Sequence, residues 1–164
     1  MIEIRRARPR DASTIVGFQV RMARETEGME LDPATVERGV QAVFDDPSKG
    51  AYWLAELDGE VVASTLVLPE WSDWRNGIVL WIHSLYVVPP ARRRGVFRAL
   101  FLHLKRRVQR SDGLKGLRLY VDRRNRVAQA AYEAMGLSRE RYQLYEWLEA
   151  EDRPRPEPPA ATSP

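Results

Sequence analysis

A chain of 164 residues is long enough for one domain with a substantial hydrophobic core. Its net charge is only +3, and 23 acidic residues are interspersed with 26 basic ones, so we expect no nucleic-acid partner. The absence of cysteine excludes disulfides, thiolate metal sites and a cysteine nucleophile.

The first half of the chain predicts a strand, two helices and a hairpin of two more strands. Residues 2–5 alternate between apolar and polar, as a half-buried strand does. A first helix follows, and Asp32 with Pro33 marks the start of a second, since the carboxylate can cap a helix that proline begins. Residues 51–57 and 60–68 read as strands around Asp58-Gly59, a strong signal for a two-residue hairpin turn.

The second half predicts a fourth strand over residues 78–88 and a third helix from residue 95 to about residue 110. A fifth strand is expected over residues 117–121. A fourth helix begins at Asn125 and ends at Gly136, and residues 142–148 form a last strand.

The domain is expected to span residues 1–149. From residue 150 the chain is rich in proline and poor in apolar residues, which predicts a disordered tail over residues 150–164. No apolar run approaches the ~20 residues of a membrane span, and the N-terminus lacks the apolar region of a signal peptide. We therefore expect a cytoplasmic protein with no membrane partner.

A turn between the fourth strand and the third helix is the strongest candidate site. Pro89-Pro90 ends the strand, and a run of arginines meets Gly95 where the helix begins. The free N–H groups of a helix N-terminus attract anions, and glycine lets the backbone approach a phosphate closely. The turn could therefore hold a pyrophosphate; the alternative is an ordinary strand–loop–helix with solvated arginines.

Two motifs carry a resemblance to a known family. The run R-R-R-G-V-F, preceded by S-L-Y-V, resembles the acetyl-CoA motif [QR]-x-x-G-x-[GA] of the GCN5-related N-acetyltransferases, although Phe97 stands where that family has a small residue. Downstream, Asn125, Ala128, Tyr132 and Gly136 match the family pattern N-x-x-A-x-x-x-Y-x-x-x-G. The resemblance covers residues 2 to 148.

The resemblance implies the α/β fold of the GNAT acyl-CoA N-acyltransferases. This fold has a mixed central sheet of six to seven strands, flanked by four helices, with strands four and five splayed apart at one end. Acetyl-CoA would be the co-substrate, its pantetheine arm entering the gap between these strands, and no metal would be required. The expected contacts with it are Leu85, Tyr86, Val87, Arg92, Arg93, Arg94, Gly95, Val96, Phe97, Arg98 and Asn125.

The resemblance also implies catalytic roles. Tyr132 would be the acid that protonates the departing thiolate, and a backbone N–H near Leu85 or Tyr86 would stabilise the oxyanion. His83 is the candidate base, because an imidazole has an unperturbed pKa of ~6.5. Glu70 and ordered water are alternatives to His83. Ordinary structural roles, as a core tyrosine and a sheet histidine, are the competing interpretations.

The acceptor is expected to bind residues of the first half of the chain. Carboxylates and rings could build a wall that suits a cationic or aromatic amine; the candidates are Glu25, Glu30, Glu70, Trp71 and Trp74. Solvated acids and core tryptophans are the simpler interpretation of these residues.

The function that we expect is transfer of the acetyl group of acetyl-CoA to a primary amine of a small molecule, by direct attack in a ternary complex. Acetylation of a protein N-terminus or lysine is the alternative within the class. A non-catalytic acyl-CoA-binding module is the alternative of another class. The last strands could also support a homodimer.

Overall fold

The computed structural model describes residues 1–139 and 143–147. The chain divides into one unit of residues 1–125 and a second that begins at Arg126. Among the described residues, no helix is long and apolar enough to cross a membrane. The strands and α-helices are β1 (Ile2–Arg6), α1 (Ala12–Met22), α2 (Pro33–Asp45), β2 (Ala51–Leu57), β3 (Glu60–Ser72), β4 (Gly77–Val87), α3 (Val96–Gln109), β5 (Leu114–Leu119) and α4 (Arg126–Ala134).

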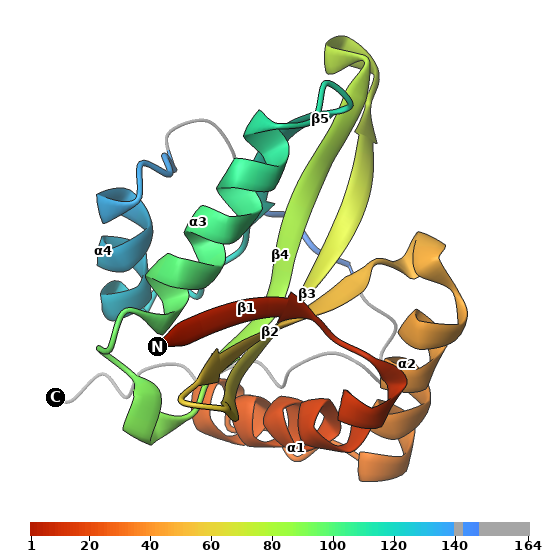
Figure 1. The fold of residues 1–164 in the computed structure, drawn as a ribbon, viewed down its shortest axis with the longest axis vertical. Helices are drawn as coiled ribbons and strands as arrows, with labels where there is room; N and C mark the ends of the chain where they lie inside the picture. Colours follow the sequence, from red (N-terminus) through yellow and green to blue (C-terminus); the bar gives the residue numbers. More distant parts are fainter. Residues whose placement is uncertain (140–142, 148–164) are drawn as a thin grey trace, which may run out of the picture. The chain divides into compact units, whose positions relative to one another are not determined.

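The first unit is built on one mixed sheet with the strand order β1-β2-β3-β4-β5 (Figure 1). The first four strands pair antiparallel, and β5 runs parallel to β4. A parallel pair needs a crossover, and α3 supplies it between β4 and β5.

The predicted number of six to seven strands is wrong for the part of the chain that is described, which contains five. The predicted last strand, residues 142–148, is one strand that the described residues do not form. Its described residues, 143–147, form no strand, and Tyr145 and Trp147 are 88% and 71% exposed. Its end residues, 142 and 148, lie outside the described residues, as does the predicted tail, 150–164.

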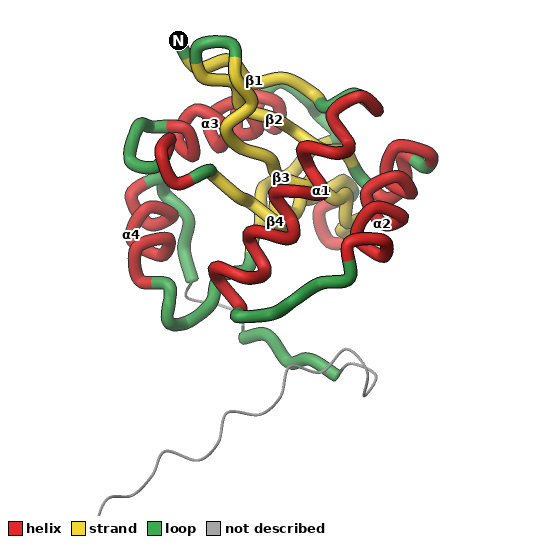
Figure 2. Tube along the Cα trace, turned by 90° about the horizontal axis from the view of Figure 1, so that it is seen from below, coloured by secondary structure: helices red, strands yellow, loops and turns green. Residues whose placement is uncertain are grey.

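Helices of the first unit cover both faces of the sheet. Tyr52 and Leu54 of β2 point to one face, where they pack with Ile15 of α1 and Val40 of α2. The intervening Trp53 points to the other face, where its ring contacts His103 of α3. Figures 1 and 2 show α1 and α2 side by side, and the contacts of α3 run to β5, β1 and β2.

Local signals place several of these elements as predicted. The Asp32 carboxylate accepts hydrogen bonds from the backbone N–H groups of Ala34 and Thr35, which starts α2. Asp58 and Gly59 both have positive φ, 54° and 89°, as a tight hairpin turn between β2 and β3 requires. The fifth strand instead begins at Leu114, three residues before the predicted start, because Leu114 is the partner of Ile78 in β4.

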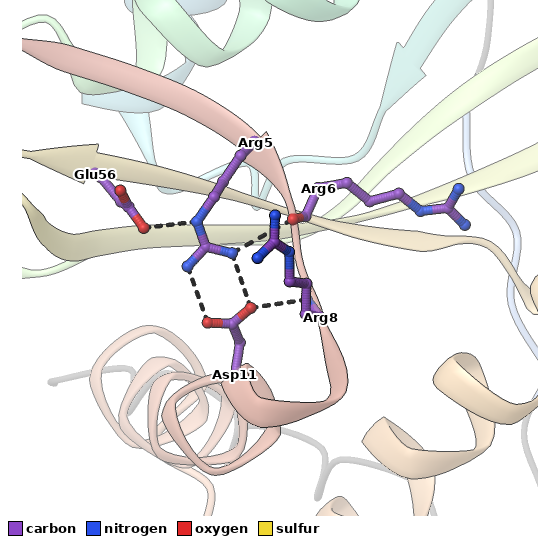
Figure 3. Close-up of polar contacts among 5 residues, drawn as sticks. All are labelled: Arg5, Arg6, Arg8, Asp11 and Glu56. Carbon is purple, nitrogen blue, oxygen red and sulfur yellow. Dashed lines mark hydrogen bonds and ion pairs between the residues drawn. The ribbon is translucent and has the colours of Figure 1, made fainter.

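Arg5 ties β1 to its neighbours through an ion-pair network (Figure 3). Its guanidinium donates two hydrogen bonds to the Asp11 carboxylate, at 2.8 and 2.9 Å, and one to Glu56 of β2, at 2.6 Å. Asp11 also accepts from the backbone N–H of Arg8 at 2.7 Å. Asp11 and Arg5 are largely buried, so one charged group fixes the first strand, the start of α1 and β2 together.

Candidate functional site

The parallel strands β4 and β5 separate part-way along β4. Their pairing runs from Ile78 with Leu114 to Ile82 with Leu119, and β5 ends there. Strand β4 continues to Val87, so residues 83–87 pair with β3 on one edge and have no β5 partner on the other. The pairing thus ends in the part of β4 where the family resemblance predicts that the fourth and fifth strands splay apart.

A β-bulge interrupts β4 at the point of separation. Tyr86 pairs with Ser64 and His83 with Leu66, so that Ser84 and Leu85 together face only Thr65 of β3. Ser84 has a φ of 49°, a left-handed conformation that is uncommon for a residue with a side chain. The fully buried Thr65 donates a 2.7 Å hydrogen bond from its hydroxyl to the carbonyl of His83, which holds the bulge.

The bulge determines which backbone groups of β4 face the side where β5 has ended. The N–H of Val88 donates to Val62 of β3 at 2.9 Å, and Tyr86 is opposite Ser64. Because backbone groups alternate along a strand, those of Leu85 and Val87 point away from β3. The carbonyl of Val87 accepts a hydrogen bond from Arg92, in agreement with this direction. The same alternation predicts that the N–H of Leu85 points to that side.

The turn after β4 leads into α3 through Gly95, an N-cap residue that offers no side-chain hydrogen bond to the helix. Arg93 and Gly95 have positive φ, 63° and 81°, and Gly95 directly precedes the helix. Gly95 has no side chain to cap the first helical N–H groups, which belong to Val96, Phe97 and Arg98. A Cβ atom built on Gly95 would meet open space, so an anion has room to approach these groups.

The arginines of this turn differ in their contacts. Arg92 binds the carbonyl of Val87, pairs with Glu25 and lies 5.6 Å from the centre of the Tyr86 ring. Arg93, Arg94 and Arg98 are exposed. Three of these basic side chains are thus directed to solvent, while Arg92 is held against the end of β4.

Arg92 belongs to a cluster that joins α1 to the end of β4. Glu25 lies in the π-helical turn Ala23–Glu27 after α1, and it accepts a 2.7 Å hydrogen bond from the buried Tyr86 hydroxyl. The hydrogen bonds from Arg92 and Tyr86 lower the pKa of Glu25 below its usual range. Glu25 is therefore a carboxylate whose two oxygens are both engaged.

A second cluster surrounds His83. The Trp81 ring centre lies 6.0 Å from that of His83 and 4.5 Å from that of Tyr120, and His83 and Tyr120 meet edge-on at 5.7 Å. The Trp81 indole N–H donates to Glu70, which also accepts a 2.6 Å hydrogen bond from Arg118 of β5. Burial lowers the pKa of His83, so the imidazole is neutral at physiological pH.

The carboxylates expected to bind the acceptor each have a basic partner. Glu25 pairs with Arg92, Glu30 with Arg24, and Glu70 with Arg118. Trp71 at the end of β3 and Trp74 in the following turn are 63% and 87% exposed. The side chains of these residues thus form no uncompensated negative wall, and their contact with an acceptor stays a prediction.

The remaining expected site residues are Asn125, directly before α4, and Tyr132, in the second half of that helix. Asn125 ends the first unit, and Tyr132 belongs to the second. Burial raises the pKa of Tyr132, which keeps its hydroxyl protonated at neutral pH. Within the second unit, Gly136, with a φ of 84°, follows the helix, and Arg139 pairs with Glu133. The catalytic role of Tyr132 stays a prediction.

Sequence reasoning missed Thr65 and Arg118 as parts of this site. Neither stands in a recognised motif, and the contacts of both depend on strand register. The bulge breaks the alternation of a regular strand. His83 and Tyr86 are three residues apart, yet they share one face of the sheet. Among the described residues, no group of acids and histidines is arranged to hold a metal.

Comparisons with known proteins agree on a family. The acetyltransferase (GNAT) family model matches residues 18–137. A possible acetyltransferase from Clostridium difficile 630 is 42% identical, with a TM-score of 0.83 over 90% of this chain and 97% of its own. No curated protein sequence matches the chain.

Two more distant structures share the fold alone. A predicted acetyltransferase with acetyl-CoA from Clostridium acetobutylicum is 19% identical, with a TM-score of 0.66 over 91% of this chain and 95% of its own. A ribosomal-protein-alanine N-acetyltransferase from Brucella melitensis biovar Abortus 2308 is 15% identical, with a TM-score of 0.74 over 90% and 99%.

Proposed function

Because this chain belongs to the acetyltransferase (GNAT) family, we propose that it transfers the acetyl group of acetyl-CoA to a primary amine of a small molecule. The observation that carries the proposal is the edge of β4 over residues 83–87, which β5 leaves unpaired and which the chain follows with the Gly95 turn into α3. Acetyl-CoA has a peptide-like arm, which can pair with a strand edge, and a pyrophosphate, which can bind at the start of a helix. The solved structure of a fold neighbour with acetyl-CoA supports this choice of donor.

Binding of acetyl-CoA would use backbone groups more than side chains. The N–H of Leu85 and the region around Val87 would pair with the amides of the pantetheine arm, as a neighbouring strand would. The N–H groups of Val96, Phe97 and Arg98 would receive the pyrophosphate at the positive end of α3. Arg93, Arg94 and Arg98 would add charge.

In the reaction, the amine nitrogen attacks the thioester carbonyl carbon, and the carbon–sulfur bond then breaks. His83, neutral because of its burial, would accept the proton that the amine loses, directly or through water. A backbone N–H at Leu85 would donate to the carbonyl oxygen as it becomes negative. Tyr132, whose hydroxyl burial keeps protonated at neutral pH, would give a proton to the thiolate of CoA.

The acceptor side would be the half-buried ring cluster of Trp81, His83 and Tyr120. Because the nearby acids are already paired with arginines, a polycation gains little there, whereas an amine with an apolar or aromatic body can pack on the rings. This favours a small amine over the lysine-rich segment of a protein.

A thiol-release screen tests the proposed function. The purified chain is given acetyl-CoA with a library of small amines, and with peptides that offer a free N-terminus or lysine, and free CoA is measured. We expect release with one or more small amines. Release only with peptides would show a protein acetyltransferase, and acetyl-CoA binding without release would show a non-catalytic module.

A further inference from the structure

A basic hollow lies beside the second half of α3, away from the Gly95 turn. Its volume is about 320 Å³, and its lining residues are His103, Arg106, Arg107 and Arg110. These positions are three or four residues apart, so they share one face of the helix. They lie in its second half, whereas the Gly95 turn is at its first residue.

Trp53 of β2 holds two of these side chains in place. The His103 ring centre lies 4.8 Å from the Trp53 ring, and the Arg107 guanidinium carbon lies 4.8 Å from the centre of the same ring. Trp53 itself is buried. An arginine stacked on a fixed ring loses less freedom when it binds a ligand than a solvated one does.

Within the described part of the chain, the arginine charges of this hollow are compensated by no ion pair, since no carboxylate there pairs with Arg106, Arg107 or Arg110. Arg6 of β1 stands directly opposite Trp53 in the sheet, so it adds a further positive charge on this face. The helix dipole favours basic residues near a C-terminus, but it does not require them to surround a hollow.

We propose that this hollow is a second anion site, which binds the phosphate groups of a polyanionic ligand independently of acetyl transfer. The basic row from residue 103 to residue 110 extends about 10 Å at 1.5 Å per residue, more than one phosphate covers. Arginine forks match phosphate oxygens in pairs. A chain of phosphates therefore fits better than a single one, whether it comes from a free polyphosphate or from a nucleic-acid backbone.

The two histidines of the chain make the test specific, because each gives its own ring resonances in NMR spectra. The full chain is titrated with tripolyphosphate, orthophosphate and a short single-stranded oligonucleotide at constant ionic strength. We expect tripolyphosphate to shift the His103 resonances saturably while those of His83 stay in place. The pKa of His103, which burial and then Arg107 and Arg106 lower, should rise when the anion binds.

Two double variants separate the hollow from general charge. Arg106→Gln/Arg110→Gln should weaken tripolyphosphate binding at least tenfold, whereas Arg10→Gln/Arg38→Gln, which removes two exposed charges elsewhere, should not. Tighter binding of the oligonucleotide would identify a nucleic-acid backbone as the source, and tighter binding of tripolyphosphate a free polyphosphate. No saturable shift of His103, a shift that sodium chloride reproduces, or equal binding by both variants would overturn the proposal.

Discussion

Thr65 shows how one buried hydroxyl on β3 helps to set the direction of backbone groups on the neighbouring strand β4. Ser84 adopts a left-handed conformation, which costs roughly 1–2 kcal/mol for a residue with a Cβ. The hydrogen bond from Thr65 to the carbonyl of His83 offsets part of that cost. Without this hydrogen bond the bulge is less stable, and the N–H of Leu85 is no longer held toward the unpaired edge of β4.

Thr65→Val should therefore damage activity more than its small change in volume suggests. Loss of the hydroxyl leaves the His83 carbonyl without its partner, so we expect a decrease of about 1–3 kcal/mol in the free energy of unfolding. We also expect a decrease of at least tenfold in kcat/KM, measured by CoA release. Thr65→Ser is the matched control, and a Val variant as active as the Ser variant would show that the bulge does not depend on this bond.

His83 should control the acidic limb of the pH–rate profile. Burial disfavours the imidazolium, so the folded-state pKa lies below the ordinary value of ~6.5. A base must be neutral, and we therefore expect kcat to fall only when the pH drops below that lowered pKa. His83→Gln should slow the reaction and remove this limb. An unchanged profile in the variant would eliminate His83 as the base.

Tyr132→Phe should lower kcat more than it weakens acetyl-CoA binding. The substitution keeps the ring and removes only the hydroxyl, which burial keeps protonated and so available as a proton donor. Turnover comes from initial rates and binding from calorimetry. Equal losses in both quantities would limit the hydroxyl to a binding role.

At the scale of elements, Gly95 links the end of β4 to α3. Its φ of 81° disfavours any side chain, yet the space around it is open. Gly95→Ala should lower the free energy of unfolding by about 1 kcal/mol, and its Cβ should raise the KM for acetyl-CoA. Gly95→Asn tolerates the left-handed conformation better. If the rise in KM came from backbone strain alone, Gly95→Asn would have a KM close to that of the wild type. We expect instead that both variants have a raised KM, because both place a side chain where the pyrophosphate would bind.

Elements whose cause is local were predictable from the sequence. Three features are determined by neighbouring residues alone: the start of α2 at Asp32-Pro33, the Asp58-Gly59 turn, and the start of α3 at Gly95. The start of β5 was not predictable in this way, because it depends on the partner strand. The partner of Glu25 is Arg92, 67 residues further along the chain, and no pattern in the sequence joins them.

At the scale of the whole molecule, the network around Arg5 connects stability to pH. The hydrogen bonds from Arg5 lower the pKa of Asp11 against the opposing effect of burial. A carboxylate with a lowered folded-state pKa stabilises the protein above its unfolded pKa of ~3.9. That contribution is lost as the pH falls through the lower, folded-state value.

Asp11→Asn should therefore lower the free energy of unfolding by about 1–3 kcal/mol at pH 7, and by less at pH 3. Urea unfolding between pH 3 and pH 7 measures both values. The exposed Asp112→Asn variant serves as the control and should follow the wild type. A constant difference between Asp11→Asn and the wild type across this range would mean that the ionised pair contributes nothing.

The central claim is that the free edge of β4 and the uncapped start of α3 together receive acetyl-CoA. A crystal structure of the chain grown with acetyl-CoA tests it most directly. We predict the pantetheine arm along residues 83–87, hydrogen-bonded to the backbone of Leu85, and the pyrophosphate at the N–H groups of Val96, Phe97 and Arg98. Acetyl-CoA bound elsewhere, with the edge of β4 left bare, would contradict the account.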